Sequence, residues 1–171
     1  QITPTHLFSV RPDKALLTLL SRLPVRNAET IFGAIATDLK AIGIDLLPAY
    51  LFMEAAMPAP GCLGLRTPSA SEQNDIDLGL RVAKTTSGLE IGQTVVIKQG
   101  TILAVEAFEG TDETLERAGR LGGPGAVVVK VAKRGHDMRF DIPIIGLKTL
   151  KVLRKIQASA LAVEAGRTIL L

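Results

Sequence analysis

Apolar residues alternate along the chain between helical spacing and short continuous runs. Residues 28–42 carry an apolar stripe with i, i+3, i+4, i+7 spacing, which predicts a helix that Gly43 ends. Residues 12–20 predict a shorter helix that opens with proline. The apolar run at residues 44–47 predicts a brief strand that Pro48 stops. The N-terminal part is therefore expected to be two helices followed by a strand.

The rest of the chain alternates helical patterns with nearly all-apolar runs. Residues 94–98 and 101–107 predict two strands joined by a hairpin turn at Gln99-Gly100, because glycine tolerates positive φ. Strands this apolar are usually covered on both faces. The other expected elements are helices from Ser69 or Ser71 to Gly88, at 113–121 and at 149–157, and strands at 126–132, 161–164 and 168–171. This order predicts an α/β fold, a mixed β-sheet with helices on both faces.

A change in composition marks a domain boundary near residue 60. Residues 55–68 hold three prolines and two glycines and show little periodicity, as linkers do. We therefore expect residues 1–60 to be the C-terminal part of one domain with its linker, and residues 61–171 to be a second, α/β domain. The chain begins without an initiator methionine and stops inside the apolar run at 168–171, so we expect a piece of a longer protein.

Composition narrows the class of protein. The chain has 171 residues, of which 47% are hydrophobic and 22% charged, as in ordinary globular proteins. No apolar stretch reaches the ~18 residues of a membrane span. Aromatic residues make up 4% and tryptophan is absent, so the chain offers no stacking surface for nucleic acid. The single Cys62 fits a reducing compartment, which favours the cytoplasm, and the net charge of +3 only weakly favours phosphate ligands.

Acidic residues cluster directly after the second strand of the predicted hairpin. Glu106, Glu109 and Asp112 fall within seven positions around Gly110. Like charges so close together repel unless a cation lies among them, and Mg²⁺ prefers such oxygen ligands. The alternative is structural. Thr111 or Asp112 caps the next helix and Glu113 complements its dipole, each contributing on the order of 1 kcal/mol.

A second charged segment, residues 130–143, follows the next apolar strand. Basic side chains that hold phosphate oxygens and carboxylates that hold a metal would together make a metal-assisted diphosphate site. The alternative is a surface loop of ion pairs, each worth about 0–1 kcal/mol. His136 lacks a second histidine or a cysteine nearby and is expected to be a polar loop residue. The charged residues are Lys130, Lys133, Arg134, Asp137, Arg139 and Asp141.

The last predicted helix has a basic face. This is usually a solvated surface, and the alternative is contact with an anionic membrane surface. Common nucleophile-elbow, Walker, zinc-spacing and dinucleotide-binding motifs are absent from the sequence. The basic residues are Lys148, Lys151, Arg154 and Lys155.

Three motifs in order carry a family resemblance: residues 103–112 with the sequence LAVEAFEGTD, Lys130 with residues 135–146, and residues 162–166 with the sequence AVEAG. Together they resemble the C-terminal domain of the bacterial UDP-2,3-diacylglucosamine pyrophosphatases of lipid A and lipopolysaccharide biosynthesis, the type without a metallophosphoesterase fold. The resemblance covers residues 61–171. Less tightly, residues 1–60 resemble the tail of that family's Rossmann-like N-terminal domain.

The resemblance implies an activity. Enzymes of this family hydrolyse the diphosphate of UDP-2,3-diacylglucosamine to 2,3-diacylglucosamine 1-phosphate, called lipid X, and UMP, with Mg²⁺ as cofactor. It also implies a cytoplasmic protein with peripheral contact to the inner membrane. We further expect a homo-oligomer that binds no nucleic acid.

The resemblance and the two charged segments together give the expected site. In this family, the aspartate of the E-G-T-D motif is required for activity. By the resemblance, that aspartate corresponds to Asp112. The expected catalytic residues are Asp112, Glu106 and Asp137; the substrate-binding residues are Lys130, Arg139, Thr111 and His136; and the metal ligands are Asp112, Asp141 and Glu109. The rival hypothesis is a non-catalytic phospholigand-binding or oligomerisation module.

Overall fold

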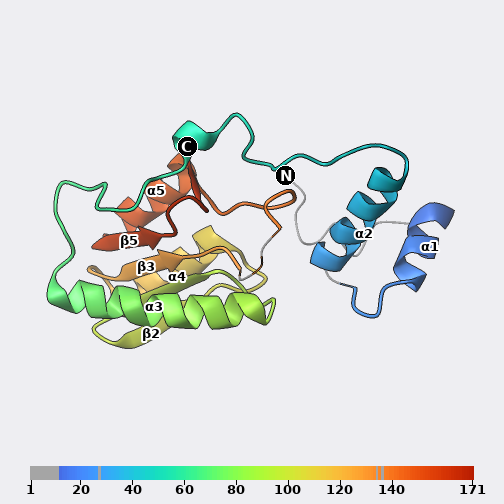
Figure 1. Ribbon diagram of the computed structural model, residues 1–171. Helices are drawn as coiled ribbons and strands as arrows, with labels where there is room; N and C mark the ends of the chain where they lie inside the picture. The colour runs from blue at the N-terminus through green and yellow to red at the C-terminus, as the bar shows by residue number, and fades with distance from the viewer. Residues whose placement is uncertain (1–11, 27, 134, 136) are drawn as a thin grey trace. The chain divides into compact units, whose positions relative to one another are not determined.

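A computed structural model describes residues 12–26, 28–133, 135 and 137–171. The chain forms two compact units (Figure 1). The first holds residues 1–51 and 137–141, and the second holds residues 52–136 and 142–171. None of the helices in the described part of the chain is long and apolar enough to cross a membrane.

The first unit begins with two helices, α1 (Lys14–Ser21) and α2 (Ala28–Ala41). Asp13 caps α1 by accepting a hydrogen bond from the Leu16 amide at 2.8 Å. Gly43, at φ +83°, ends α2 as predicted, because a left-handed residue redirects the chain. The strand predicted at residues 44–47 is wrong. That apolar run is mostly exposed, and no neighbouring strand of the described residues pairs with it.

Residues 137–141 belong to the same unit although they lie about a hundred positions further along the chain. The Ala49 amide donates to the Met138 carbonyl at 2.9 Å. The rings of Phe32 and Phe140 stack with their centroids 5.6 Å apart. This short segment is therefore packed against α2 and the residues that follow it.

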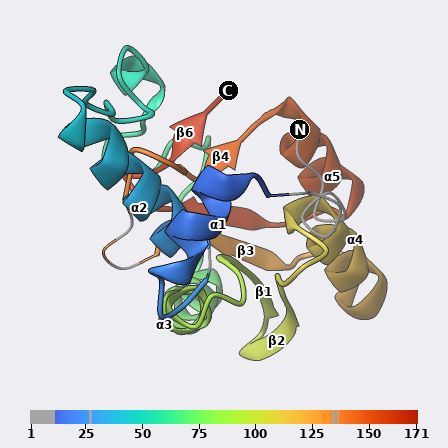
Figure 2. The ribbon, with the colours of Figure 1, turned by 90° about the vertical axis from the view of Figure 1, so that its right-hand side faces the viewer.

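The second unit is built on a mixed four-stranded sheet with strand order β2-β1-β3-β5 (Figures 1 and 2). β1 runs antiparallel to β2 and β3, whereas β3 and β5 are parallel. A separate parallel pair is formed by β4 and β6, and a short 3₁₀ helix, η2, lies near the start of the unit. The bounds are β1 Thr94–Lys98, β2 Thr101–Val105, β3 Val127–Lys130, β4 Ile144–Ile145, β5 Ala160–Val163, β6 Ile169–Leu170 and η2 Glu54–Ala56. The α/β prediction with a mixed sheet is confirmed.

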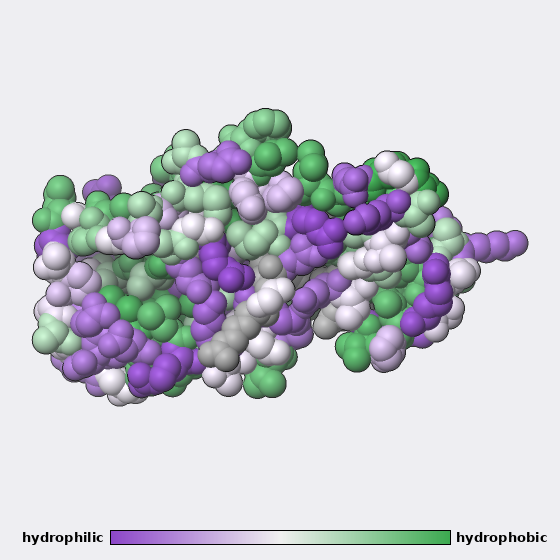
Figure 3. All heavy atoms as spheres, in the orientation of Figure 1, coloured by the Kyte–Doolittle hydropathy of each residue, from purple (hydrophilic) through white to green (hydrophobic). Residues whose placement is uncertain are grey.

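Helices cover both faces of this sheet. α3 (Ala70–Gly88) packs against β1 and β3 on one face, and hydrophilic side chains lie along its outer side (Figure 3). α4 (Thr111–Gly122) and α5 (Leu147–Lys155) pack on the other face. The expectation that β2 is also covered on both sides holds only for its later residues: α3 and α4 both contact this edge strand, but Thr101 and Ile102 are exposed.

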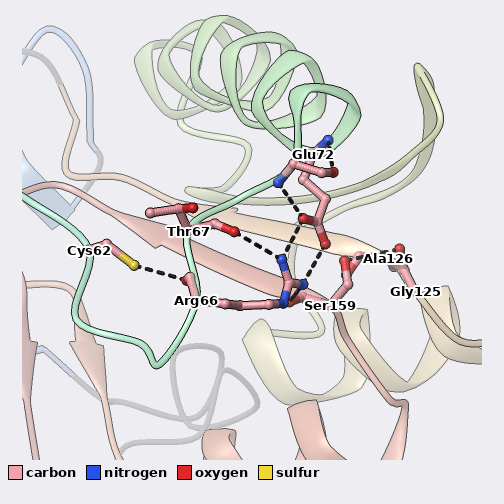
Figure 4. Close-up of polar contacts among 8 residues, drawn as sticks. Cys62, Arg66, Thr67, Glu72, Gly125, Ala126 and Ser159 are labelled. Carbon is pink, nitrogen blue, oxygen red and sulfur yellow. Dashed lines mark hydrogen bonds and ion pairs between the residues drawn. The ribbon is translucent and has the colours of Figure 1, made fainter.

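An arginine ties the segment before α3 to the start of β5. The two terminal nitrogens of Arg66 each donate to one carboxylate oxygen of Glu72 at 2.7 Å, and Nη2 also donates to the Ser159 carbonyl at 2.9 Å (Figure 4). Glu72 and Ser69 form a reciprocal capping box at the start of α3. The hydrogen bonds from Arg66 hold the pKa of Glu72 well below its ordinary value of 4.5.

The free energy of unfolding is expected to depend on pH through Glu72. A carboxyl whose pKa is lowered by folding contributes its full stabilisation above its unfolded pKa, and this contribution declines as the pH falls from the unfolded pKa towards the folded pKa. Glu72→Gln should therefore lower the melting temperature at neutral pH, and the difference from wild type should shrink at about pH 3. Glu54→Gln, at an exposed carboxylate of the same unit, is the control. A pH-independent difference would mean that the charge of Glu72 does not carry the effect.

Candidate functional site

The acidic motif after β2 forms a tight turn into α4. Gly110 lies at φ +83° and is the N-cap of the helix, which begins at Thr111. The helix therefore starts two residues earlier than predicted, and the interpretation of Thr111 or Asp112 as its cap is wrong. A glycine at this position makes no side-chain capping hydrogen bond. Asp112 instead lies in the first turn, where a carboxylate favours the positive end of the helix dipole.

Asp112 faces the beginning of α5. Its Oδ1 accepts a hydrogen bond from the Thr149 hydroxyl at 3.0 Å, and its Oδ2 pairs with the Lys148 ammonium at 2.9 Å. The bond to Asp112 raises the pKa of Lys148. The Asp112 side chain keeps 23% of its area exposed. It is therefore a half-buried carboxylate, held in position and still accessible to a ligand.

Glu109 lies in the turn before α4 and is held by side chains of that helix. Its Oε1 pairs with Arg117 Nη2 at 2.5 Å and accepts from the Thr114 hydroxyl at 3.2 Å. These contacts, led by the hydrogen bond from Arg117, lower the pKa of Glu109. Arg117 also donates to the Val105 carbonyl at 3.0 Å, so it links the end of β2 to the turn. The repulsion expected among the clustered carboxylates is offset here by cations of the chain itself.

A row of polar residues crosses the sheet beneath α4. Thr94 of β1 pairs with Lys130 of β3, and the Glu106 amide donates to the Thr94 carbonyl at 2.8 Å. Because side chains alternate along a strand, these three point to the same face as Val96 and Val128, which contact α4 and α5. All three are buried, with 0% of Thr94, 6% of Lys130 and 8% of Glu106 exposed.

The Thr111 hydroxyl joins the two charges of this row. It donates to Glu106 Oε1 at 2.8 Å and accepts from Lys130 Nζ at 2.9 Å. Lys130 Nζ also lies 3.5 Å from the Ile144 carbonyl oxygen of β4. Among the described residues, Glu106 Oε2 and the Thr94 hydroxyl have no hydrogen-bond partner. The structure thus brings Glu106, Thr111, Asp112 and Lys130 of the predicted site together.

The second charged segment divides between the two units. Lys130 is in the sheet of the second unit, whereas Asp137, Arg139 and Asp141 belong to the first. Arg139 Nη2 pairs with Asp137 Oδ2 at 2.6 Å, and this hydrogen bond raises the pKa of Arg139. The Arg139 guanidinium also lies 5.2 Å from the centroid of the Phe140 ring. The surface ion pair expected under the structural alternative is therefore present, and a site shared by the two segments stays a prediction.

Two residues of the predicted second segment, Arg134 and His136, lie outside the described residues. The substrate-binding role of His136 accordingly stays a prediction.

Sequence reasoning missed the role of Glu164, which follows β5. Its Oε2 accepts from the Ala132 amide at 2.7 Å and its Oε1 pairs with Lys84 of α3 at 2.6 Å. Lys84 in turn donates to the Ala132 carbonyl at 2.7 Å. These bonds fix the chain where it leaves β3. The signal in the sequence that could have indicated this role was the single carboxylate of Glu164 between the apolar residues Val163 and Ala165.

The residues of the second unit fit Mg²⁺ in one respect. The accessible carboxylate of Asp112 is the hard oxygen donor that this ion prefers, and Mg²⁺ often uses one or two carboxylates together with substrate phosphate. Within the described ranges, no three His, Cys, Asp or Glu side chains gather as a metal-binding group. Magnesium dependence stays a prediction.

The basic face predicted on the last helix is partly used in ion pairs. Lys148 pairs with Asp112, and Lys155 Nζ pairs with Glu116 Oε1 of α4 at 2.9 Å. Leu147 and Leu150 of α5 are exposed. The membrane contact expected of this helix stays a prediction.

Comparison with known proteins gives two similarities. Residues 59–171 match the family model described as the LpxI C-terminal domain. The chain is also 30% identical over 170 residues to the UDP-2,3-diacylglucosamine pyrophosphatase LpxI of Caulobacter vibrioides. That alignment covers 93% of this chain and 61% of the Caulobacter protein. The chain thus spans about three fifths of its relative's length.

Proposed function

Because this chain belongs to the LpxI C-terminal domain family, we propose that it acts in the hydrolysis of UDP-2,3-diacylglucosamine. Water attacks the diphosphate, one P–O bond breaks, and the products are 2,3-diacylglucosamine 1-phosphate and UMP. The observation that carries the proposal is the family match across residues 59–171, which include the whole E-G-T-D motif. The name of the relative supports the same substrate, and we propose that the reaction serves lipid A biosynthesis.

The geometry around α4 supports Asp112 as the central catalytic residue. Its carboxylate is accessible and is held in one direction by Thr149 and Lys148. The start of α4 has no side-chain cap, so its first N–H groups favour an anionic ligand such as a phosphate oxygen. Asp112 would therefore orient the attacking water, or hold a metal, next to the place that suits the diphosphate.

A bound Mg²⁺ would supply charge neutralisation on the leaving phosphate and a more acidic water. Asp112 is the first residue we propose for holding it, with Glu109 and Asp141 as further ligands. Glu109 resembles Asp112 in that both of its oxygens have protein partners: Arg117 and Thr114 bind Oε1, and the Ala107 amide binds Oε2. We propose that Arg139, His136 and Asp137 of the second segment contribute to substrate binding and catalysis.

Family membership also supports proposals on the compartment, the neighbouring domain and the oligomeric state. We propose a cytoplasmic enzyme that reaches its lipid substrate at the inner membrane, with residues 1–60 as the tail of a Rossmann-like domain. We also propose that the protein acts as a homo-oligomer.

An assay of UMP release tests the function. The protein that carries this chain is incubated with UDP-2,3-diacylglucosamine, and the LpxI of Caulobacter vibrioides is the positive control. We expect UMP and 2,3-diacylglucosamine 1-phosphate in equal amounts. EDTA should abolish the reaction and excess Mg²⁺ should restore it. Substrate binding without turnover would support the non-catalytic phospholigand module instead, and activity that survives EDTA would remove the metal from the proposal.

A further inference from the structure

We propose that Glu106 and Lys130, joined through the Thr111 hydroxyl, are positioning residues that fix the direction of Asp112. This inference rests on the proposed function, because it gives the three residues a task in the same reaction. It differs from the expectation that Lys130 holds phosphate directly. Lys130 is only 6% exposed, and its ammonium contacts groups of the protein.

The chemistry of the three groups fixes the direction of each hydrogen bond. An ammonium only donates and a carboxylate only accepts, whereas a hydroxyl does both. Thr111 therefore gives its single proton to Glu106 and turns a lone pair toward Lys130. A buried charge without a partner is costly, so each of the two charges stabilises the other through this hydroxyl. The Thr111 side chain is thereby held on both sides.

This link sets the first turn of α4. Thr111 is the first residue of the helix and Asp112 is the second, and successive side chains are separated by about 100° around a helix axis. When the Thr111 side chain is directed down onto the sheet, Asp112 is directed to the side, where it meets α5. A rotation of this turn would move the carboxylate away from Lys148 and Thr149.

Lys130 also reaches the segment that leads into α5. Its ammonium lies 3.5 Å from the carbonyl oxygen of Ile144, two residues before the N-cap Gly146. One buried ammonium therefore contacts the start of α4 and the strand that precedes α5. α4 supplies Asp112, and the strand leads directly into α5, which supplies its partners, so Lys130 is placed to keep the two helices in register.

The decisive variant removes only the hydroxyl. Thr111→Val is isosteric and breaks the link between Glu106 and Lys130. We expect kcat to fall by roughly 10- to 100-fold, because small misplacements of a reacting group cost that much, while KM changes by less than about 3-fold. Thr111→Ser restores the hydroxyl and should recover most of the lost kcat. Thr94→Val makes the same change at a buried threonine of the same row, and is the matched control.

A double-variant cycle separates positioning from direct phosphate binding. If Glu106 and Lys130 act as one unit, Glu106→Gln, Lys130→Met and the double variant should lower kcat by similar factors. Independent, multiplying effects, or a large rise in KM with kcat unchanged in Lys130→Met, would overturn the proposal.

Hydrogen exchange tests the inference without the reaction. The Thr114 amide, which donates to the Gly110 carbonyl at 3.1 Å, should exchange at least about 10-fold faster in Thr111→Val than in Thr94→Val. Equal exchange in the two variants would show that the hydroxyl does not hold the first turn. If this difference is found but the wild-type protein releases no UMP, the proposed function fails while the structural link stands.

Discussion

Asp112→Ala is expected to lower kcat for UDP-2,3-diacylglucosamine by on the order of 10³-fold or more, equivalent to about 4 kcal/mol of transition-state stabilisation. Asp112 is the accessible carboxylate of the E-G-T-D motif, and its position is held by Thr149 and Lys148. Under the proposed function, its removal takes away the group that orients water or metal but leaves the rest of the surface in place. The variant should therefore still bind substrate, which calorimetry can measure separately from UMP release.

Two further variants make this result specific. Asp77→Ala removes an exposed aspartate from α3 and should keep wild-type turnover. Asp112→Asn keeps an oxygen for the Thr149 hydroxyl but loses the charge, so it should be nearly as inactive as the alanine variant. Unchanged turnover in Asp112→Ala would contradict the assignment of Asp112 as a catalytic residue.

Gly92→Ala is expected to destabilise the protein by about 3 kcal/mol. A Cβ at this position would lie 2.1 Å from the carbonyl oxygen of Glu106 and 2.6 Å from its carbonyl carbon. These are backbone atoms, and the Glu106 amide is bonded to Thr94, so the strand would have to shift. The same shift would displace the buried Glu106 side chain, and we therefore expect lower kcat as well as lower stability.

Gly88→Ala is the matched control for this change. Its added Cβ meets no atom within 4 Å, and Gly88 is the last residue of α3. Alanine should be neutral there or stabilise by up to about 1 kcal/mol. Urea unfolding of both variants measures the difference. A loss below about 1 kcal/mol in Gly92→Ala, with an unchanged m-value, would mean that the backbone at Glu106 yields easily.

Local signals in the sequence predicted most helices and strands, but not how the strands are arranged. The helical pattern from Ser69 or Ser71 to Gly88 predicted α3, and Gln99-Gly100 predicted the hairpin, because spacing and turn chemistry act over a few residues. An all-apolar run does not show which strands lie beside it. For this reason the sequence did not indicate that β2 is an edge strand whose first residues are exposed.

In the candidate site too, the sequence indicated local features but not the contacts between distant residues. The carboxylates of the E-G-T-D motif were visible as a cluster, and the choice of Asp112 among them stays a prediction. The start of α4 was missed because its N-cap, Gly110, has no side chain to signal it. The cations that pair with the acidic residues, such as Lys148 for Asp112 and Lys84 for Glu164, come from distant parts of the chain. Sequence spacing carries no information about such pairs.

The buried polar row also bears on how the sheet assembles. β3 is three valines followed by Lys130, and valines are interchangeable in their pairing with β1. A slip of one residue would turn every side chain of β3 to the opposite face. Lys130 would then face α3, among Ile76 and Ala83, and would lose Thr111 and Glu106. One charged residue thus makes a single strand alignment far more favourable than its neighbours, in a segment whose apolar residues discriminate poorly.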